Sequence, residues 1–256
     1  MQIPYSPSRL DTTMFLKNNI RKYLRPDQSI IDIGCGAMYL SNLLDSLKLK
    51  INYLGVDLNP KNTKFRSVYL KTKIVKGDIL NFKAKRKFDL VACLWTLEHI
   101  KHDQGACKKM FGLLNKEGFA VIAVPSIWSW PIEFGRHGYR YYSKTQIIKL
   151  VKSAGFGVAE FYESGGFLGL LFMLIYSWPR YLVLVPLLII YTILNFLNLV
   201  RVSWEKFSHK VVSNVFYFYH KSQEGILFHN MIVSKIVALD NKFKIFPASY
   251  VLILKK

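Results

Sequence analysis

A short apolar segment that ends in two closely spaced glycines constrains this chain more than any other feature. The segment reads Ile30-Ile31-Asp32-Ile33-Gly34-Cys35-Gly36. β-Branched residues followed by glycine are typical of a buried parallel strand that enters a tight turn. In an open α/β sheet, a nucleotide-like ligand binds at the turn after the first strand, and glycine lets the backbone approach it. The motif therefore predicts an α/β fold with a ligand site at this turn.

The acidic residue in this segment narrows the choice of ligand. Asp32 lies two residues before Gly34, so its side chain can reach a cationic or hydroxylic group above the turn. An acid at this place favours a cofactor that carries an amino acid over one that carries a pyrophosphate. We therefore expect S-adenosylmethionine.

Apolar segments and helical patterns alternate along most of the chain. The predicted strands are Ser29–Ile33, Ile51–Val56, Lys73–Val75, Phe88–Leu94, Phe119–Val124, Gly157–Tyr162 and Tyr250–Leu254. The predicted helices are Thr12–Leu24, Tyr39 to about Lys48, Gln104–Leu114 and one that Ser143 caps, to about Ala154. Such alternation predicts a doubly wound α/β sheet of seven strands, mostly parallel, with helices on both faces.

The stretch before the last strand is strongly apolar. Residues 166–178 carry no charge, Pro179-Arg180 interrupts, and residues 181–200 are uncharged for twenty residues. Because a spanning helix needs about 20 apolar residues, the second segment qualifies, whereas the first fits a re-entrant or interfacial piece. We expect membrane anchoring or association through residues 166–200, although a buried helical hairpin remains the alternative. The cations Arg201, Lys206 and Lys210 suit an anionic cytoplasmic interface.

Composition points to an anionic partner and a reducing compartment. The chain has 256 residues, with 36 Lys and Arg against 16 acids, for a net charge of +20. Such an excess attracts nucleic acid or an anionic membrane, unless it is only a basic surface without a partner. The three cysteines show neither metal spacing nor even pairing, and no secretory signal opens the sequence. We therefore expect a cytoplasmic protein.

These features together resemble the class I S-adenosylmethionine-dependent methyltransferases, over about residues 29–162 and 249–254. The resemblance implies a methyltransferase domain of residues 1–163 and 249–256, with a hydrophobic helical insert at 164–248. It implies that the loop wraps the methionine part of the cofactor, with contacts from Asp32, Gly34, Cys35 and Gly36. Met38 stands where the family has a third glycine.

The same resemblance implies further cofactor residues. Asp57, at the end of the second strand, would accept hydrogen bonds from the ribose diol, with Leu58 beside it. Asp78 would bind the adenine amino group, with Ile79 packed nearby, and Leu94 would border the site from the fourth strand. For Asp57 and Asp78 the alternative is an ordinary turn aspartate.

Two histidines are candidate general bases. His99 follows Glu98 in the loop after the fourth strand, where the pair acts either as a base or as a clamp beneath the cofactor. His137 lies in an aromatic and basic loop after the fifth strand that we expect to shape the acceptor pocket; alternatively, it packs among the aromatics. Quinone-type relatives have a glutamate where this chain has Trp95, so no metal site is predicted. Trp95 could instead wall off the sulfonium or fill the core.

We therefore predict methyl transfer to a lipophilic or membrane-held small molecule, such as a lipid-linked sugar or a polyprenoid. The insert and the ending formed by Leu239-Asp240-Asn241 and residues 250–255 resemble methyltransferases of surface-glycan and lipid metabolism. An RNA methyltransferase is one alternative, in which the basic residues between Lys61 and Lys87 would bind the nucleic acid. We consider nucleic acid the less favoured partner. A non-catalytic membrane-bound adaptor also stays open. A dehydrogenase fits less well, because its glycine motif would have glycine at the position of Tyr39 and would give Asp32 no role.

Overall fold

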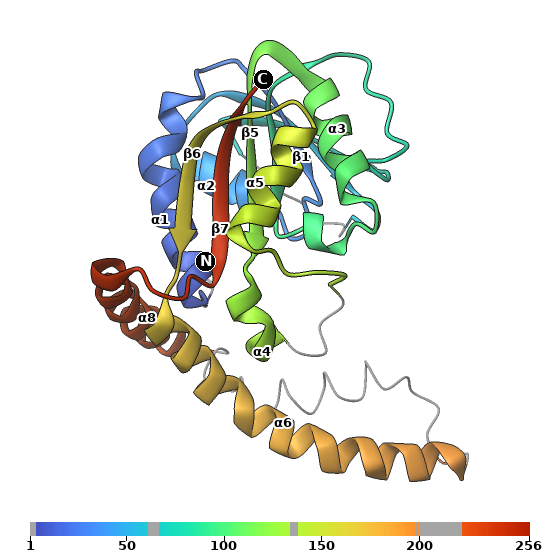
Figure 1. Cartoon of the computed structure of the whole chain (residues 1–256), viewed down its shortest axis with the longest axis vertical. Coiled ribbons are helices and arrows are strands. Elements are labelled where there is room, and N and C mark those ends of the chain that lie inside the picture. The colour runs from blue at the N-terminus through green and yellow to red at the C-terminus, as the bar shows by residue number, and fades with distance from the viewer. Residues whose placement is uncertain (1–3, 61–66, 134–137, 198, 200–221) are drawn as a thin grey trace. The chain divides into compact units, whose positions relative to one another are not determined.

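A seven-stranded sheet is the core of the α/β part of the chain (Figure 1). The computed structural model describes residues 4–60, 67–133, 138–197, 199 and 222–256. The strand order is β3-β2-β1-β4-β5-β7-β6, and only β7 runs antiparallel to its neighbours β5 and β6. The strands are β1 (Ser29–Ile33), β2 (Ile51–Asp57), β3 (Leu70–Lys76), β4 (Phe88–Leu94), β5 (Leu114–Pro125), β6 (Gly157–Ser164) and β7 (Ser249–Lys255). The predicted doubly wound, mostly parallel sheet is confirmed.

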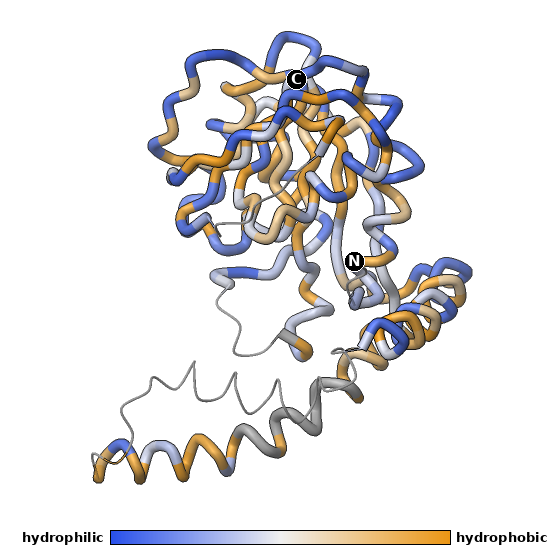
Figure 2. The backbone as a smooth tube through the Cα atoms, turned by 180° about the vertical axis from the view of Figure 1, so that it is seen from behind, coloured by the Kyte–Doolittle hydropathy of each residue, from blue (hydrophilic) through white to orange (hydrophobic). Residues whose placement is uncertain are grey.

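Helices cover both faces of the sheet, so its strands are buried on both sides. Ile30 and Ile31 point to opposite faces, and each joins a separate core: Leu44 of α2 packs in the first core and Met110 of α3 in the second. Figure 2 shows the strands as a mainly hydrophobic interior beneath hydrophilic loops. The helices are α1 (Pro7–Asn19), α2 (Tyr39–Ser46), α3 (Asp103–Leu113), α4 (Trp130–Glu133) and α5 (Lys144–Ser153), with short 3₁₀ turns η1 (Ile20–Lys22), η2 (Leu97–His99) and η3 (Ile127–Ser129).

Two predicted elements begin five residues earlier than expected, each for a local reason. The fifth strand begins at Leu114 instead of Phe119, because the expected turn is absorbed into an irregular stretch of β5 where the register against β4 shifts. The first helix begins at Pro7, since proline fits the first helical position. The predicted cap of α5 is confirmed: Ser143 and Gln146 form a reciprocal capping box.

The chain divides into two compact units. One comprises residues 11–164 and 246–256 and contains the sheet; the other comprises residues 1–10 and 165–245. The second unit contains the long helices α6 (Phe167–Phe196) and α8 (Gln223–Phe243). Within the described part of the chain, no helix combines the length and the apolar character needed to cross a bilayer.

The predicted interruption at Pro179-Arg180 is wrong, because α6 is one helix of 30 residues. A proline inside a helix removes one backbone hydrogen bond and favours a bend. The helical hydrogen bonds on either side of it can nevertheless continue. Leucines, which are good helix formers, lie on both sides of Pro186, whereas Trp178 and Arg180 flank Pro179. The helix runs through both prolines.

A buried aspartate joins α8 to the start of α6. The Asp240 carboxylate accepts the backbone amides of Leu168, at 2.9 Å, and Gly169, at 2.7 Å. These amides belong to the first turn of α6, which has no intrahelical acceptors for them. A Cβ on Gly166 would lie 2.7 Å from the Asp240 carboxyl carbon, so only glycine leaves enough room for the carboxylate at this position.

Candidate active site

The glycine loop after β1 is anchored to the ends of two neighbouring strands. Gly34 donates its amide to the Val56 carbonyl of β2 at 2.7 Å. Gly34 has φ of +72°, and a Cβ there would lie 2.2 Å from Oγ1 of Thr96, which follows β4. Only glycine fits both this backbone conformation and this contact. The loop therefore sits where the carboxyl ends of β1, β2 and β4 meet.

Asp57 holds this loop through its side chain. One carboxylate oxygen accepts the Gly36 amide at 2.9 Å, and the other accepts the Asn59 amide at 2.8 Å. The Asp57 carbonyl also accepts the Gly77 amide at 2.9 Å, which brings the end of β3 to the same edge. Each carboxylate oxygen can accept a second hydrogen bond, so the fixed side chain retains capacity for the two hydroxyls of a ribose.

Asp32 is a buried acid on β1 that fits a cationic ligand group. It accepts a hydrogen bond from the Tyr53 hydroxyl at 2.5 Å. Burial raises the pKa of Asp32 to about 7, the Tyr53 hydrogen bond opposes this rise, and the nearby Asp57 charge adds to it. An ammonium group would relieve the penalty of a buried negative charge. The α-amino group of S-adenosylmethionine has that chemistry, and the residues present therefore fit this cofactor.

The remaining predicted cofactor residues differ in exposure. Asp78 is half-buried after β3, and its carboxylate accepts the Leu80 amide at 2.9 Å. Ile79 and Leu94 are buried in the two cores, while Leu58 is 66% exposed. Asp78 thus lies at the same edge as Asp57, because the intervening Gly77 is bonded to the Asp57 carbonyl. The cofactor contacts assigned to these residues stay predictions.

The thiol of Cys35 is buried in the core on the α2 side. A Cβ on Gly55 of β2 would lie 2.8 Å from the Cys35 sulfur, so the glycine makes room for the thiol. Burial, with the charges of Asp32 and Asp57, raises the pKa of Cys35 to about 12. The side chain is therefore a neutral packing group, and Cys35 could contact a ligand through its backbone.

Glu98 and His99 lie in η2, directly beyond β4. Glu98 is buried, whereas the His99 side chain is 49% exposed, and its Nε2 lies 3.9 Å from a Glu98 carboxylate oxygen. The Glu98 carbonyl accepts the Tyr139 amide at 2.8 Å, which ties the loop after β5 to this turn. His137 lies outside the described residues. Among the residues that are described, no cluster of three or more metal-ligating side chains occurs.

A polar cluster that the sequence did not predict fixes the second half of the loop after β5. The Asp103 carboxylate forms an ion pair with Arg140 and accepts the Tyr142 hydroxyl at 3.1 Å. Arg140 also donates to the Lys101 carbonyl at 2.8 Å. Because these groups are far apart in the sequence, their pairing follows from the fold alone. Tyr53 and Thr96 were missed for the same reason, although the mid-strand Gly55 does signal a close approach.

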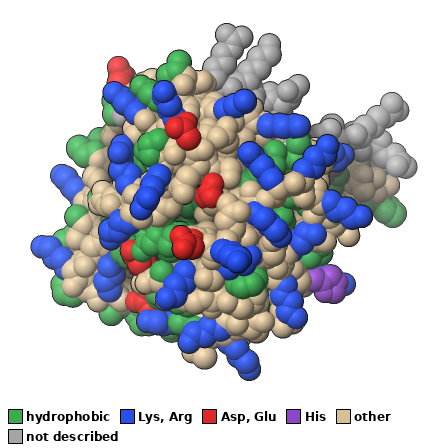
Figure 3. All heavy atoms as spheres, turned by 90° about the horizontal axis from the view of Figure 1, so that it is seen from above, with side chains coloured by type: hydrophobic (Ala, Val, Ile, Leu, Met, Phe, Trp, Pro, Cys, Tyr) green, Lys and Arg blue, Asp and Glu red, His purple; other side chains and the backbone are tan. Residues whose placement is uncertain are grey.

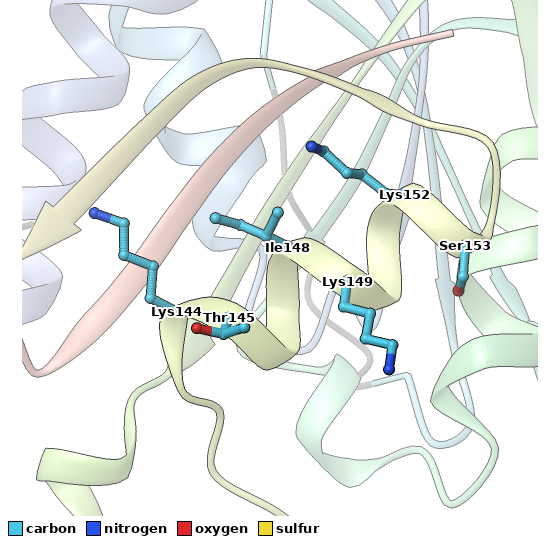
Figure 4. Close-up of a pocket in the computed structure, with 6 residues that line it drawn as sticks. All are labelled: Lys144, Thr145, Ile148, Lys149, Lys152 and Ser153. Atoms are coloured by element: carbon cyan, nitrogen blue, oxygen red, sulfur yellow. The ribbon is translucent and has the colours of Figure 1, made fainter.

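One surface hollow lies away from these residues. It has a volume of about 710 Å³ and is lined by α5 alone, as Figure 4 shows, through Lys144, Thr145, Ile148, Lys149, Lys152 and Ser153. A second hollow, of about 550 Å³, borders the Asp103–Arg140 cluster. Neither is lined by a predicted cofactor residue, so we do not assign the cofactor to them.

Comparison with known proteins decides the family. A family model described as a methyltransferase domain matches residues 13–160, which is more than half of the chain. The chain belongs to this family. The sheet order, the glycine loop and the acid at the end of β2 agree with it, and the domain is an S-adenosylmethionine-dependent methyltransferase domain. The predicted resemblance and cofactor are thereby confirmed.

Named relatives of this methyltransferase include two enzymes of quinone metabolism. The mitochondrial ubiquinone biosynthesis O-methyltransferase of Saccharomyces cerevisiae is 28% identical over 108 residues, covering 40% of this chain and 34% of the relative. The ubiquinone biosynthesis O-methyltransferase of Pelagibacter ubique is 24% identical over 177 residues, covering 58% and 71%. The chain thus spans about a third of the length of the yeast relative.

A solved structure shares the fold across almost the whole methyltransferase. An S-adenosylmethionine-dependent methyltransferase of Archaeoglobus fulgidus has a TM-score of 0.53 at 17% identity, covering 95% of this chain and 94% of that one. At this identity the likeness shows the fold alone, because one fold hosts many chemistries.

Proposed function

We propose that this protein transfers a methyl group from S-adenosylmethionine to an oxygen of a lipophilic small molecule held in or at a membrane. When bound, the cofactor supplies an electrophilic methyl group and leaves as a neutral thioether. The protein's task is then mainly to align donor and acceptor, because the reaction is a direct displacement. In this proposal, one group of residues binds the methyl donor, one residue accepts the proton, and an apolar surface binds the molecule that receives the methyl group.

Three carboxylates make up the donor-binding group of the proposal. Asp32 binds the ammonium group of the cofactor and Asp57 the ribose hydroxyls. Asp78 binds the adenine amino group. Their support is that Asp57 is fixed by the Gly36 amide of the glycine loop, and that a backbone bond joins Asp57 to the residue before Asp78. A carboxylate with one lone pair already used by a backbone donor is oriented for the next hydrogen bond.

His99 is the proposed general base for a hydroxyl acceptor. Its ring is half-exposed beside the buried Glu98 carboxylate, which can hold the imidazolium that forms when the proton arrives. His137 is the second candidate. The alternative role of the Glu98–His99 pair, a clamp beneath the cofactor, remains open in this proposal.

The exposed apolar surface of α6 carries the acceptor part of the proposal. Its exposed large hydrophobic side chains include Leu182, Val185, Leu188, Ile189, Ile190, Ile193 and Phe196. Water-exposed apolar surface of this extent marks a protein or membrane contact. We propose that residues 164–248 lie on an anionic cytoplasmic membrane face, where the acceptor is a lipid-linked sugar, a polyprenoid or a quinone precursor. The names of the ubiquinone biosynthesis relatives support the last of these.

One labelling experiment tests this function. The full chain is incubated with cofactor carrying a labelled methyl group and with a membrane lipid extract, and the products are separated by chromatography. We expect label in the organic phase, and we expect Asp57→Ala to abolish it. Label in added RNA, or no transfer by a protein that binds the cofactor, would contradict the proposal and favour the RNA methyltransferase or the adaptor.

A further inference from the structure

Trp95 has an unusual backbone conformation at the edge of the sheet where the donor is proposed to bind. It directly follows β4, and its φ of +49° is in the left-handed region, which a bulky residue rarely adopts. Its amide donates to the Ala123 carbonyl of β5 at 2.8 Å, so the neighbouring strand fixes this conformation. Strained residues of this kind persist where the surrounding structure imposes them, and they cluster at ligand sites.

A second aromatic ring accompanies Trp95. Tyr39 is the first residue of α2, and its ring meets the Trp95 ring edge to face, with centroids 5.2 Å apart and planes at 76°. The Tyr39 hydroxyl is hydrogen-bonded to Oγ1 of Thr13 on α1 at 2.6 Å. The pair is thus held from three directions, by β5, by α1 and by the ring contact itself.

Both members of the pair are close in sequence to the glycine loop and its contact residue. The loop ends at Gly36, and two residues separate it from Tyr39. Trp95 precedes Thr96, whose side chain occupies the space beside Gly34. Both rings are only partly buried, so part of their surface is open to a ligand. The aromatic pair therefore borders the loop that we assign to the methionine part of the donor.

The chemistry of the donor gives this pair a function. Bound S-adenosylmethionine carries a sulfonium cation, whereas the demethylated product carries a neutral thioether. A cation is attracted to the face of an aromatic ring, most strongly to tryptophan, and a thioether lacks this attraction. We propose that Trp95, supported by Tyr39, recognises the sulfonium and biases the site toward the methylated donor over its product. This inference rests on the donor assignment of the proposed function.

The test compares two affinities in each protein. Calorimetry gives the dissociation constants of S-adenosylmethionine and of S-adenosylhomocysteine for the wild type, Trp95→Leu, Trp95→Phe and Tyr39→Leu. We expect Trp95→Leu to shift the ratio of the two constants about 3- to 30-fold against the methylated donor. Trp95→Phe keeps a ring and should retain most of the preference, while Tyr39→Leu should shift the ratio less than Trp95→Leu.

A matched control separates recognition from packing. Phe15→Leu removes a ring that packs against the same core but stacks on Tyr162, at a centroid distance of 4.2 Å. Lost packing lowers both affinities alike, so we expect the ratio of the control to stay at the wild-type value. An unchanged ratio in Trp95→Leu, with both ligands still bound, overturns the role of Trp95 alone. A wild type that binds neither ligand overturns the donor assignment itself.

Discussion

At the residue scale, the sequence was most informative where the backbone requires one residue type. Gly34 and Gly36 both have positive φ, which suits the tight turn that the sequence predicts at this place. Met38, where the family has glycine, also adopts a positive φ of 64° and is buried. The loop therefore keeps a glycine-like backbone conformation although methionine replaces the glycine. The partners of Asp32 and Gly34 could not be predicted, because Tyr53 and Thr96 reach them through strand pairing across the sheet.

Replacing Asp32 tests its role as a buried acid. Because its folded pKa of about 7 exceeds the unfolded value near 4, the folded state retains a proton that the unfolded state releases between these pH values. Its contribution to stability is therefore present below about pH 4 and is lost as pH rises to about 7. We expect Asp32→Asn to raise the free energy of unfolding of the cofactor-free protein by about 1–4 kcal/mol at pH 8, and to change it little at pH 4.

The same variant should bind the donor less well. Loss of a charged hydrogen bond of about 1.5–3 kcal/mol predicts a 10- to 100-fold weaker affinity for S-adenosylmethionine. Thermal unfolding and calorimetry measure the two effects, with Asp27→Asn as the exposed control. A variant that is destabilised at pH 8, or that binds the donor normally, would show that Asp32 is only structural.

Replacing Gly34 tests the steric requirement of the loop. An added Cβ meets Thr96 at 2.2 Å and must adopt φ of +72°, so we expect Gly34→Ala to lose about 2 kcal/mol or more of stability. Gly112→Ala is the matched control, because no atom lies within 4 Å of its added Cβ. That control should be neutral or stabilising, since alanine favours the helix. Equal melting temperatures for the two variants would refute the steric account.

At the element scale, two strands were predicted with the bounds that the structure has, and one predicted interruption was wrong. β1 and β4 have the predicted bounds: β1 ends directly before Gly34, and β4 begins directly after Lys87. Pro179-Arg180 was predicted to interrupt the apolar stretch, yet α6 continues through it as one helix. The cap that α8 supplies to α6 lay beyond prediction, since it joins residues about 70 positions apart.

Asp240→Ala tests that cap. It leaves the amides of Leu168 and Gly169 without the carboxylate, which costs about 1–2 kcal/mol. We expect hydrogen exchange of these two amides to accelerate roughly 5- to 30-fold, because the first turn of α6 opens more often. Leu239→Ala, an exposed position on the same helix, should leave their exchange unchanged. Equal exchange in both variants would mean that the carboxylate does not stabilise α6.

At the scale of the whole molecule, many positively charged side chains lie on one face of the sheet-containing unit. Figure 3 shows many Lys and Arg side chains on the face near the C-terminus, where the parallel strands of the sheet begin. The glycine loop and Asp57 lie at the opposite ends of these strands. RNA bound to the face in Figure 3 would therefore not reach the proposed donor site. Of the predicted basic cluster, Lys61, Lys64 and Arg66 lie outside the described residues.

Vesicle binding by the full chain tests the proposed membrane contact. We expect sedimentation with anionic vesicles that weakens with salt but persists in part at 1 M, because salt screens charge and leaves apolar burial intact. Ile189→Glu with Ile193→Glu, on one face of α6, should abolish the salt-resistant part. Val68→Glu, at an 88% exposed site of the sheet unit, is the control. Binding that disappears completely in salt, or that survives the double variant, would exclude α6 as the apolar contact.

We propose that Asp32, Asp57 and Asp78 together hold one adenosyl donor at the carboxyl edge of the sheet. Calorimetric titration of the full chain with S-adenosylmethionine tests it most directly. We predict saturable binding at one site per chain, lost or greatly weakened in Asp57→Ala while the protein stays folded. No binding of either S-adenosylmethionine or its demethylated product, or undiminished binding by Asp57→Ala, would contradict the account.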